Sequence, residues 1–183
     1  MRIVARYSFN GGLERLQDDY AGLLQEVCDS IASAEAEPCK IKISKELTMQ
    51  GRVLYSPIAL NKALLQGQLY PRGWKSARVQ MTTEIPEIGR RHSGFIEADA
   101  IKEGVGVEVQ FGKYAFLGWD ILGKMVIFAR QGLIRVGVEI VPMPGLQAQM
   151  STGVGSFAQI KEILEYRGVG NIDIPVGILG VDC

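Results

Sequence analysis

The chain has 183 residues, and its content of 47% hydrophobic and 22% charged residues is ordinary for a globular protein, which excludes wholesale disorder. Its 20 Lys and Arg residues equal its 20 Asp and Glu residues, which counts against nucleic-acid binding without excluding it, because an acidic metal site can offset a local basic surface. The length predicts one domain over residues 1–183, and the lack of any apolar run of roughly 18 residues predicts a cytoplasmic protein with no membrane partner.

The first eighty residues carry ordinary structural patterns and no diagnostic motif. Apolar residues recur at spacings of three and four between Leu13 and Ile31, which predicts one amphipathic helix over about 12–34 that ends before Pro38. The other elements predicted here are a strand at Ile3–Phe9, short extended segments at Lys40–Ser44 and Arg52–Ser56, and a helix at Ile58–Leu65 closed by a turn region at Gly67–Gly73.

Residues 95–111, FIEADAIKEGVGVEVQF, are the most informative segment of the chain. From Val105 to Phe111, apolar residues alternate with glycine, glutamate and glutamine, which is the period of a half-buried strand. Phe95–Ile101 predicts a preceding strand, and Lys102–Val105 predicts a tight connection that contains a glycine. The two strands therefore form a rigid hairpin.

The connection decides which side chains of this hairpin lie opposite one another. A four-residue loop places Ile101 across from Gly106, and therefore Asp99 directly across from Glu108. Directly opposed side chains lie ~5 Å apart, and like charges at that spacing repel each other. Since a divalent cation would relieve the repulsion, the pattern predicts a metal site. The alternative is a pair of solvated carboxylates on an exposed face.

Strands and helices alternate through the second half of the chain. Lys113–Arg130 predicts a helix that Gly132 stops, and its apolar residues are too many for one exposed stripe, so we expect it to be buried in the domain or against a partner. The elements that follow are a strand at Val136–Val141, a helix at Phe157–Arg167 with the capping box Ser156–Gln159, and a strand at Ile172–Val181. This alternation predicts an α/β fold with a central sheet.

An Asp followed nine residues later by Glu-x-Gln on an apolar strand resembles the PD-(D/E)xK nucleases. It resembles more closely the BglII/BstYI group of type II restriction endonucleases, which have glutamine in place of the usual lysine. The segments 107–114 (VEVQFGKY), 137–143 (GVEIVPM) and 150–153 (MSTG) carry this likeness, which runs from about Glu84 to Asp182. The resemblance implies a restriction-endonuclease-like central mixed sheet flanked by helices.

The resemblance also implies catalytic roles for residues of the hairpin. Asp99 and Glu108, with the main-chain carbonyl of Val109, would hold Mg²⁺ beside the scissile phosphate, where the metal neutralises charge and lowers the pKa of the attacking water. Gln110 cannot supply a positive charge, but it can orient water or a phosphate oxygen by hydrogen bonding. The alternative for Gln110 is a neutral polar residue on the solvent face of the strand.

A further acidic residue before the hairpin is expected to join the catalytic site. Glu84 lies fifteen residues before Asp99, about where the resembled group carries an extra polar or acidic residue on a helix. Pro86 argues against a regular helix through this stretch, and Glu87 is the competing choice. Surface charge is the alternative for both glutamates.

Candidates for DNA contact lie in two regions. Arg90 and Arg91 form a short basic cluster before the hairpin, and Lys113 follows its last strand, so each could meet a backbone phosphate. The polar, glycine-bearing loop 147–156 corresponds to a stretch that faces the major groove in the resembled group, and its candidates for reading base edges are Gln149, Ser151 and Thr152. The alternatives are solvated surface residues and a flexible linker.

Together these patterns predict a Mg²⁺-dependent type II restriction endonuclease that acts on double-stranded DNA as a homodimer. The two-fold symmetry of a homodimer matches a short palindromic site, so that each subunit cuts one strand. The resemblance implies a GATC core, 5′ overhangs and 5′-phosphate ends. The alternatives are a repair or structure-specific nuclease of the same fold, a non-catalytic DNA-binding protein, and a plain α/β protein whose hairpin carboxylates are only solvated.

Overall fold

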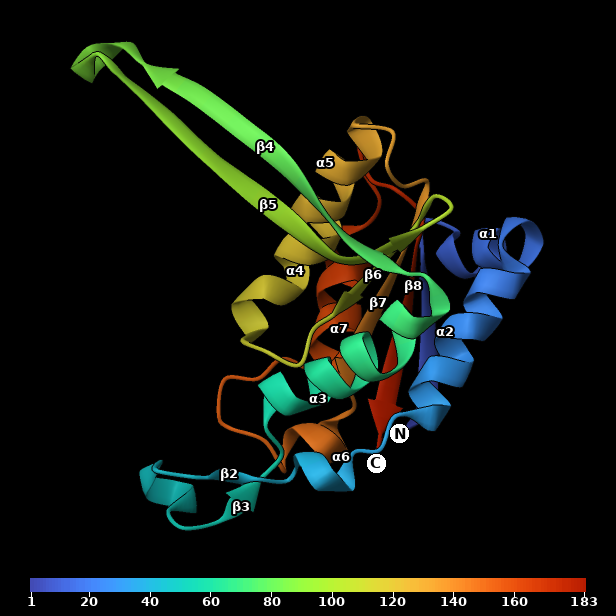
Figure 1. Ribbon diagram of the computed structural model, residues 1–183, viewed down its shortest axis with the longest axis vertical. Helices are drawn as coiled ribbons and strands as arrows, with labels where there is room; N and C mark the ends of the chain where they lie inside the picture. Colours follow the sequence, from blue (N-terminus) through green and yellow to red (C-terminus); the bar gives the residue numbers. More distant parts are fainter.

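The computed structural model describes residues 1–183 as a mixed six-stranded sheet with helices on both faces (Figure 1). The strand order is β1-β8-β7-β6-β5-β4, in which β6, β7 and β8 run parallel and the outer pairs are antiparallel. This confirms the predicted central mixed sheet flanked by helices. The strands are β1 (Arg2–Phe9), β4 (Lys75–Ile85), β5 (Arg90–Lys102), β6 (Val105–Val109), β7 (Val136–Pro142) and β8 (Val176–Asp182), and a separate two-stranded sheet joins β2 (Lys42–Ile43) to β3 (Val53–Leu54).

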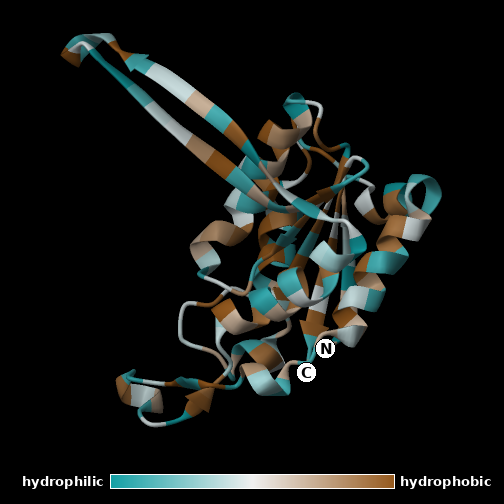
Figure 2. Ribbon diagram, in the orientation of Figure 1, coloured by the Kyte–Doolittle hydropathy of each residue, from teal (hydrophilic) through white to brown (hydrophobic).

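A hydrophobic core lies on each face of the sheet. One face is covered by α1 (Gly12–Asp19), α2 (Ala21–Ser33) and α3 (Pro57–Leu64), and the other by α4 (Leu117–Trp119), α5 (Met125–Arg130) and α7 (Phe157–Arg167). Every residue of β6 and β7 is buried, as parallel strands covered on both faces require, and Figure 2 shows their hydrophobic colouring at the centre. None of the helices is both long enough and apolar enough to cross a membrane.

The single helix predicted over 12–34 is wrong, because the backbone of Tyr20 leaves the helical region, with φ of −137° and ψ of 30°. Both resulting helices lie against β1, but their other contacts differ: α1 also packs on β7 and β8, whereas α2 packs on residues 65–69. Gly12 fixes the start of α1, since a Cβ there would come within 2.1 Å of the Val176 backbone. Both helices bury apolar residues in one core, so the apolar spacing alone does not reveal the break.

Other predicted boundaries also differ from the structure: β5 begins at Arg90 rather than Phe95, and β6 ends at Val109 rather than Phe111. The chain does not turn after α3 but continues as a π-helical turn at Leu65–Leu69 and a 3-10 turn at Tyr70–Arg72. β8 begins at Val176 rather than Ile172, because the Asp173 carboxylate accepts a bond from the Gly170 N–H and holds a turn there. The predicted strands β1, β2, β3 and β7 and the helix α7 with its capping box are confirmed.

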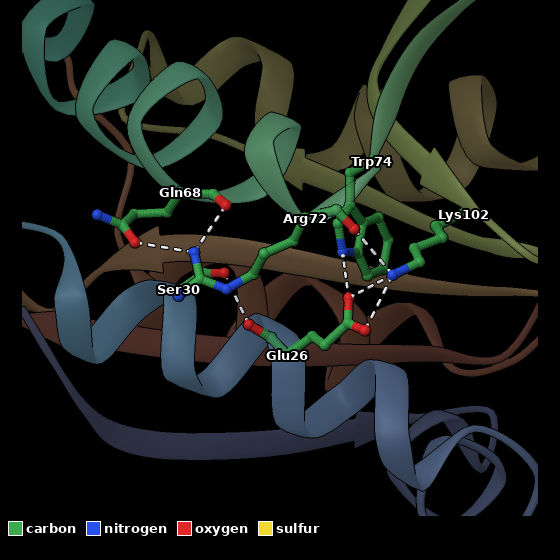
Figure 3. Close-up of polar contacts among 6 residues, drawn as sticks. All are labelled: Glu26, Ser30, Gln68, Arg72, Trp74 and Lys102. Atoms are coloured by element: carbon green, nitrogen blue, oxygen red, sulfur yellow. Dashed lines mark hydrogen bonds and ion pairs between the residues drawn. The ribbon is translucent and has the colours of Figure 1, made fainter.

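A cluster of polar contacts anchors the turn end of the β5–β6 hairpin to α2 (Figure 3). The Glu26 carboxylate accepts hydrogen bonds from the Trp74 Nε1–H at 3.0 Å and from the Lys102 ammonium at 2.7 Å. Lys102 also donates to the carbonyl of Arg72, whose guanidinium donates to Gln68. Hydrogen bonding to Lys102 is the main cause that lowers the pKa of Glu26. These contacts fix the end of β5, and with it the hairpin.

The outer parts of β4 and β5 leave the body of the protein as a long two-stranded arm (Figure 1). The arm comprises residues 80–95, and nearly all of these are exposed. A 3-10 turn at Pro86–Ile88 forms its tip, followed by Gly89 with a φ of 62°. The strand β5 therefore runs without interruption from the tip of the arm to the end of the hairpin.

Glu26→Ala should lower the free energy of unfolding by about 1–3 kcal/mol, because Trp74 and Lys102 would lose their shared acceptor. Urea denaturation followed by circular dichroism measures the loss. The matched control is Glu165→Ala on α7, which removes an exposed ion pair with Lys161 and should cost less than about 1 kcal/mol. Equal losses in the two variants would contradict an anchoring role for Glu26.

Candidate active site

Asp99 lies at a β-bulge in β5, next to the point where the β5–β6 ladder ends. Lys75 of β4 pairs with Ile101, but Ala77 pairs with Ala98, so β5 contains one more residue than β4 between these pairs. A bulge of this kind changes the direction in which side chains point. The Asp99 carboxylate accepts a hydrogen bond at 2.9 Å from the backbone N–H of Val109. The side chain thus holds the two strands together where backbone pairing stops.

The predicted register of the hairpin is confirmed, because Ile101 pairs with Gly106. The connection is tighter than expected: Lys102 pairs with Val105, and the turn consists of Glu103 and Gly104, with φ of 48° and 86°. This register brings Asp99 and Glu108 to one cavity of about 330 Å³. The hairpin therefore juxtaposes the two carboxylates that its sequence pattern singled out.

Glu108 is buried, with 3% of its surface exposed, so the alternative of a solvated carboxylate is wrong for this residue. Burial raises the pKa of Glu108 well above its usual value, and the nearby Asp99 carboxylate raises it further. Burial likewise raises the pKa of Asp99, although the bond from the Val109 N–H acts in the opposite direction. The fold thus holds both carboxylates where their negative charges are unfavourable.

Two residues that sequence reasoning missed, Asp120 and Lys124, complete this charge cluster. The Lys124 ammonium lies 2.7 Å from a carboxylate oxygen of Glu108 and 2.8 Å from one of Asp120. Both come from the helical segment predicted at 113–130, which contains a π-helical turn at Asp120–Lys124. Burial lowers the pKa of Lys124, but the carboxylates of Glu108 and Asp120 raise it more. A useful signal was present in the sequence: two opposite charges four residues apart inside an apolar helix.

Gln110 lies in the same cavity, and both ends of its amide are engaged. Its Nε2 donates to Asp120 at 2.9 Å, and its Oε1 accepts from the backbone N–H of Gly112 at 3.0 Å. The side chain is half-buried rather than on a solvent face. Gln110 therefore fixes the position of Asp120, which in turn contacts Lys124.

Glu139 is a further buried carboxyl that sequence reasoning missed. It is fully buried on β7, it pairs in register with Glu108, and neither of its carboxyl oxygens has a hydrogen-bond partner. Burial raises its pKa well above the usual value, with Asp120 and Glu108 as further causes. The repeated pattern VGVE at 105–108 and 136–139 was the available signal, since each copy puts one glutamate in an apolar strand.

The arm, rather than the cavity, carries Glu84 and Glu87. Glu84 lies on β4 opposite Arg91, which is eight strand positions from Asp99, or about 27 Å at ~3.4 Å per residue. Glu87 belongs to the turn at the tip. The segment is a strand ended by Pro86 rather than a helix, so the structure does not bring either glutamate to the carboxylates of the hairpin.

The predicted DNA-contact residues fall into two exposed regions. Arg90 and Arg91 lie at the outer end of the arm. Lys113 is exposed and pairs with Val154 in an isolated β-bridge, which joins the end of the β6 segment to the polar loop 147–156. The segment 40–46, which contains β2, contacts that loop: Lys40 donates to Gln149, Lys42 donates to Ser151, and the Glu46 carboxylate accepts from the N–H of Thr152.

The donor set of the cavity fits a divalent cation such as Mg²⁺. No three or more His, Cys, Asp or Glu side chains form a ready-made metal cage. Mg²⁺ does not need one, because it commonly binds through one or two carboxylates and keeps several of its waters. Asp99 and Glu108 supply hard oxygen atoms, and their mutual repulsion is what a cation would relieve.

A family model described as restriction endonuclease BglII/BglIII matches residues 4–181. The match spans nearly the whole chain, including the first eighty residues, in which the sequence showed no diagnostic motif. No curated protein gives a significant match.

Glu139→Gln should stabilise the metal-free protein increasingly as the pH rises above about 4.5. The pKa of Glu139 is raised in the folded protein. At pH values between its pKa in the unfolded chain and its pKa in the folded protein, the folded protein therefore binds more protons than the unfolded chain. The free energy of unfolding then falls as the pH rises. Glu139→Gln does not show this fall, because its amide does not ionise. Urea denaturation from pH 4 to pH 8 in the presence of a chelator measures the difference.

The control for this pH series is Glu162→Gln on α7, whose side chain is exposed to water in both states. It should give a constant difference from the wild-type protein. A constant difference for Glu139→Gln would instead contradict an ionisation penalty at that position.

Proposed function

The chain belongs to the BglII/BglIII family of restriction endonucleases and is therefore a site-specific deoxyribonuclease, and we propose that it uses Mg²⁺ to cut double-stranded DNA at a short palindromic site. The observation that carries the proposal is the cavity in which Asp99 and Glu108 meet on adjacent strands. A GATC core, 5′ overhangs and 5′-phosphate ends are part of the proposal, on the basis of the family resemblance.

In the proposed mechanism, Asp99, Glu108 and the main-chain carbonyl of Val109 would hold the metal. When bound, Mg²⁺ would neutralise negative charge on the phosphate and lower the pKa of the attacking water. Gln110 acts as a positioning residue, because its amide is already bound to Asp120 and to the Gly112 N–H. The Val109 N–H keeps the Asp99 carboxylate directed at the end of the ladder, beside Glu108.

The proposed DNA surface extends from this cavity in two directions. The arm continues β5 outward from Asp99, so DNA with a phosphate at the cavity would pass beside Arg90 and Arg91. In the other direction, the bridge between Lys113 and Val154 leads to the loop that carries Gln149, Ser151 and Thr152. Lys40 and Lys42 add positive charge next to that loop, which supports its placement near DNA.

We propose that two copies of the chain act together, because a palindromic site is matched by protein two-fold symmetry. The aromatic side chains left exposed near the cavity include Tyr114, Phe116 and Trp119, of which the latter two line it. Those two side chains are therefore better placed to meet DNA than to bury a dimer interface. Sedimentation of the purified protein should give a particle of twice the 20.0 kDa chain mass.

Incubation of the protein with plasmid DNA and Mg²⁺, followed by sequencing of the fragment ends, tests the proposed function. We expect discrete fragments with 5′-phosphate ends that share one palindromic sequence. Cleavage only at branches or mismatches, with no shared sequence, would instead support a structure-specific nuclease of the same fold.

Asp99→Asn should reduce the rate of Mg²⁺-dependent cleavage by at least about 100-fold, because a metal ligand loses its charge. Specific DNA binding should survive, since the variant removes a negative charge that repels phosphate. Single-turnover cleavage and gel-shift titration measure the two effects. The exposed Glu165→Gln on α7 serves as control and should cut at the wild-type rate.

The same cleavage assay decides the role of Glu84. Its position on the arm predicts an unchanged rate for Glu84→Gln, whereas a loss as large as that of Asp99→Asn would restore it as a ligand. A wild-type rate for Asp99→Asn would show that the hairpin is not the active site.

Arg90→Ala combined with Arg91→Ala should flatten the dependence of log affinity on log salt by about 1.8, since each lost phosphate contact changes this slope by ~0.9. Fluorescence anisotropy with a cognate duplex at salt concentrations from about 50 to about 200 mM measures the slope. Arg15→Ala on α1 is the control, because Arg15 pairs with Asp19 outside the arm. An unchanged slope in the arm variant would exclude these phosphate contacts.

A further inference from the structure

Lys124 is the single cationic side chain that lines the cavity. The acidic residues of that lining are Glu97, Asp99, Glu108 and Asp120. A phosphate diester that enters this space therefore meets four carboxylates and one ammonium group. The strand β6 and the residues that follow it, as far as Gly112, offer no positive charge of their own. Among the residues that line this cavity, only Lys124 can supply a cationic contact to a phosphate.

The Lys124 ammonium is bound in a way that leaves one donor free. An ammonium group has three N–H donors, and two of them are directed at Glu108 and Asp120. Its side chain is 13% exposed and the residue lines the cavity. The third donor is thus available to a phosphate oxygen without breaking either ion pair.

The local helix is shaped to hold Lys124 in this place. Residues 120–124 form a π-helical turn, a wider turn that is frequent at functional sites. Gln110 fixes Asp120 from the strand, and Asp120 contacts Lys124. At Gly123, a Cβ would come within 2.4 Å of the Trp119 ring, so only glycine allows that ring to lie against the helix beside Lys124.

We propose that Lys124 is a catalytic residue that binds the scissile phosphate, with Glu108 and Asp120 holding its ammonium in position. The inference rests on the proposed nuclease function. During hydrolysis a water oxygen bonds to phosphorus as the bond from phosphorus to the leaving oxygen breaks, and negative charge builds up on the non-bridging oxygens. The attacking water releases one proton to solvent, and the leaving oxygen takes one proton from solvent. Lys124 stabilises that charge by hydrogen bonding and keeps its own protons. A lysine from the helical segment thereby supplies the positive charge that β6 does not carry.

A purely structural role for Lys124 makes a different prediction. In that case the lysine only neutralises Glu108 and Asp120, and its loss would weaken binding of any DNA equally. A direct contact, in contrast, depends on the charge of one phosphate. Replacement of that phosphate with an uncharged methylphosphonate separates the two cases.

The test compares Lys124→Met with the wild-type protein on two duplexes in the absence of metal, one natural and one with a methylphosphonate at the mapped cut position. We expect Lys124→Met to weaken binding of the natural duplex about tenfold, as one lost ionic contact implies, and to leave binding of the methylphosphonate duplex nearly unchanged. Mg²⁺-dependent cleavage of the natural duplex should fall at least about 100-fold. Lys124→Arg should recover most of the binding difference between the two duplexes.

The control is Lys161→Met on α7, which removes an exposed lysine that also pairs with a carboxylate four residues away and should change neither readout. If circular dichroism shows that Lys124→Met does not fold, the double variant Lys124→Met and Asp120→Asn, in which neither residue of that ion pair is charged, is tested by the same two measurements. Equal losses of affinity on both duplexes, or a wild-type cleavage rate, would overturn the inference. A wild-type protein that cuts no DNA with Mg²⁺ would instead overturn the proposed function.

Discussion

Four acidic side chains, Asp99, Glu108, Asp120 and Glu139, meet between the central sheet and the helical segment 114–130, where burial makes their negative charges unfavourable. One lysine, Lys124, offsets part of that charge inside the cluster. The remaining excess of negative charge is what makes the cavity suited to a divalent cation. The surrounding sheet and helices hold these acidic groups together despite their repulsion.

The burial of apolar side chains on both faces of the sheet stabilises the fold against this repulsion. The strands β6 and β7 place valine and isoleucine in the core formed with α1, α2 and α3, while their glutamates lie on the opposite face. The alternation along a strand gives each glutamate apolar neighbours whose burial is worth about 1.5–3 kcal/mol each. The contacts of Glu26 with Trp74 and Lys102 anchor the end of β5, and pairing with β4 continues on both sides of the bulge at Asp99.

The cavity also lies at the junction of two surfaces that differ in character. The arm is a two-stranded ribbon without a covering layer, and Figure 2 shows mixed hydrophilic and hydrophobic positions along it. Ribbons of two strands are marginally stable alone, so the arm is expected to be firmer when it lies against a substrate. The polar loop 147–156 is instead held by hydrogen bonds to residues 40–46, the segment that contains β2. The cavity is thereby flanked by an extended surface on one side and a compact one on the other.

The sequence by itself determined the strands around the hairpin, the helix α7 and the register that brings Asp99 beside Glu108, because alternation, capping and a short turn act between near neighbours in the chain. It also carried the family resemblance. Only the tertiary structure decided the rest of the site: the bond from Lys124 to Glu108 joins different elements, and the pairing of Glu108 with Glu139 depends on a parallel crossover. The break at Tyr20 and the position of Glu84 on the arm likewise follow from which surfaces α1, α2 and β4 pack against, and local patterns do not record such long-range packing.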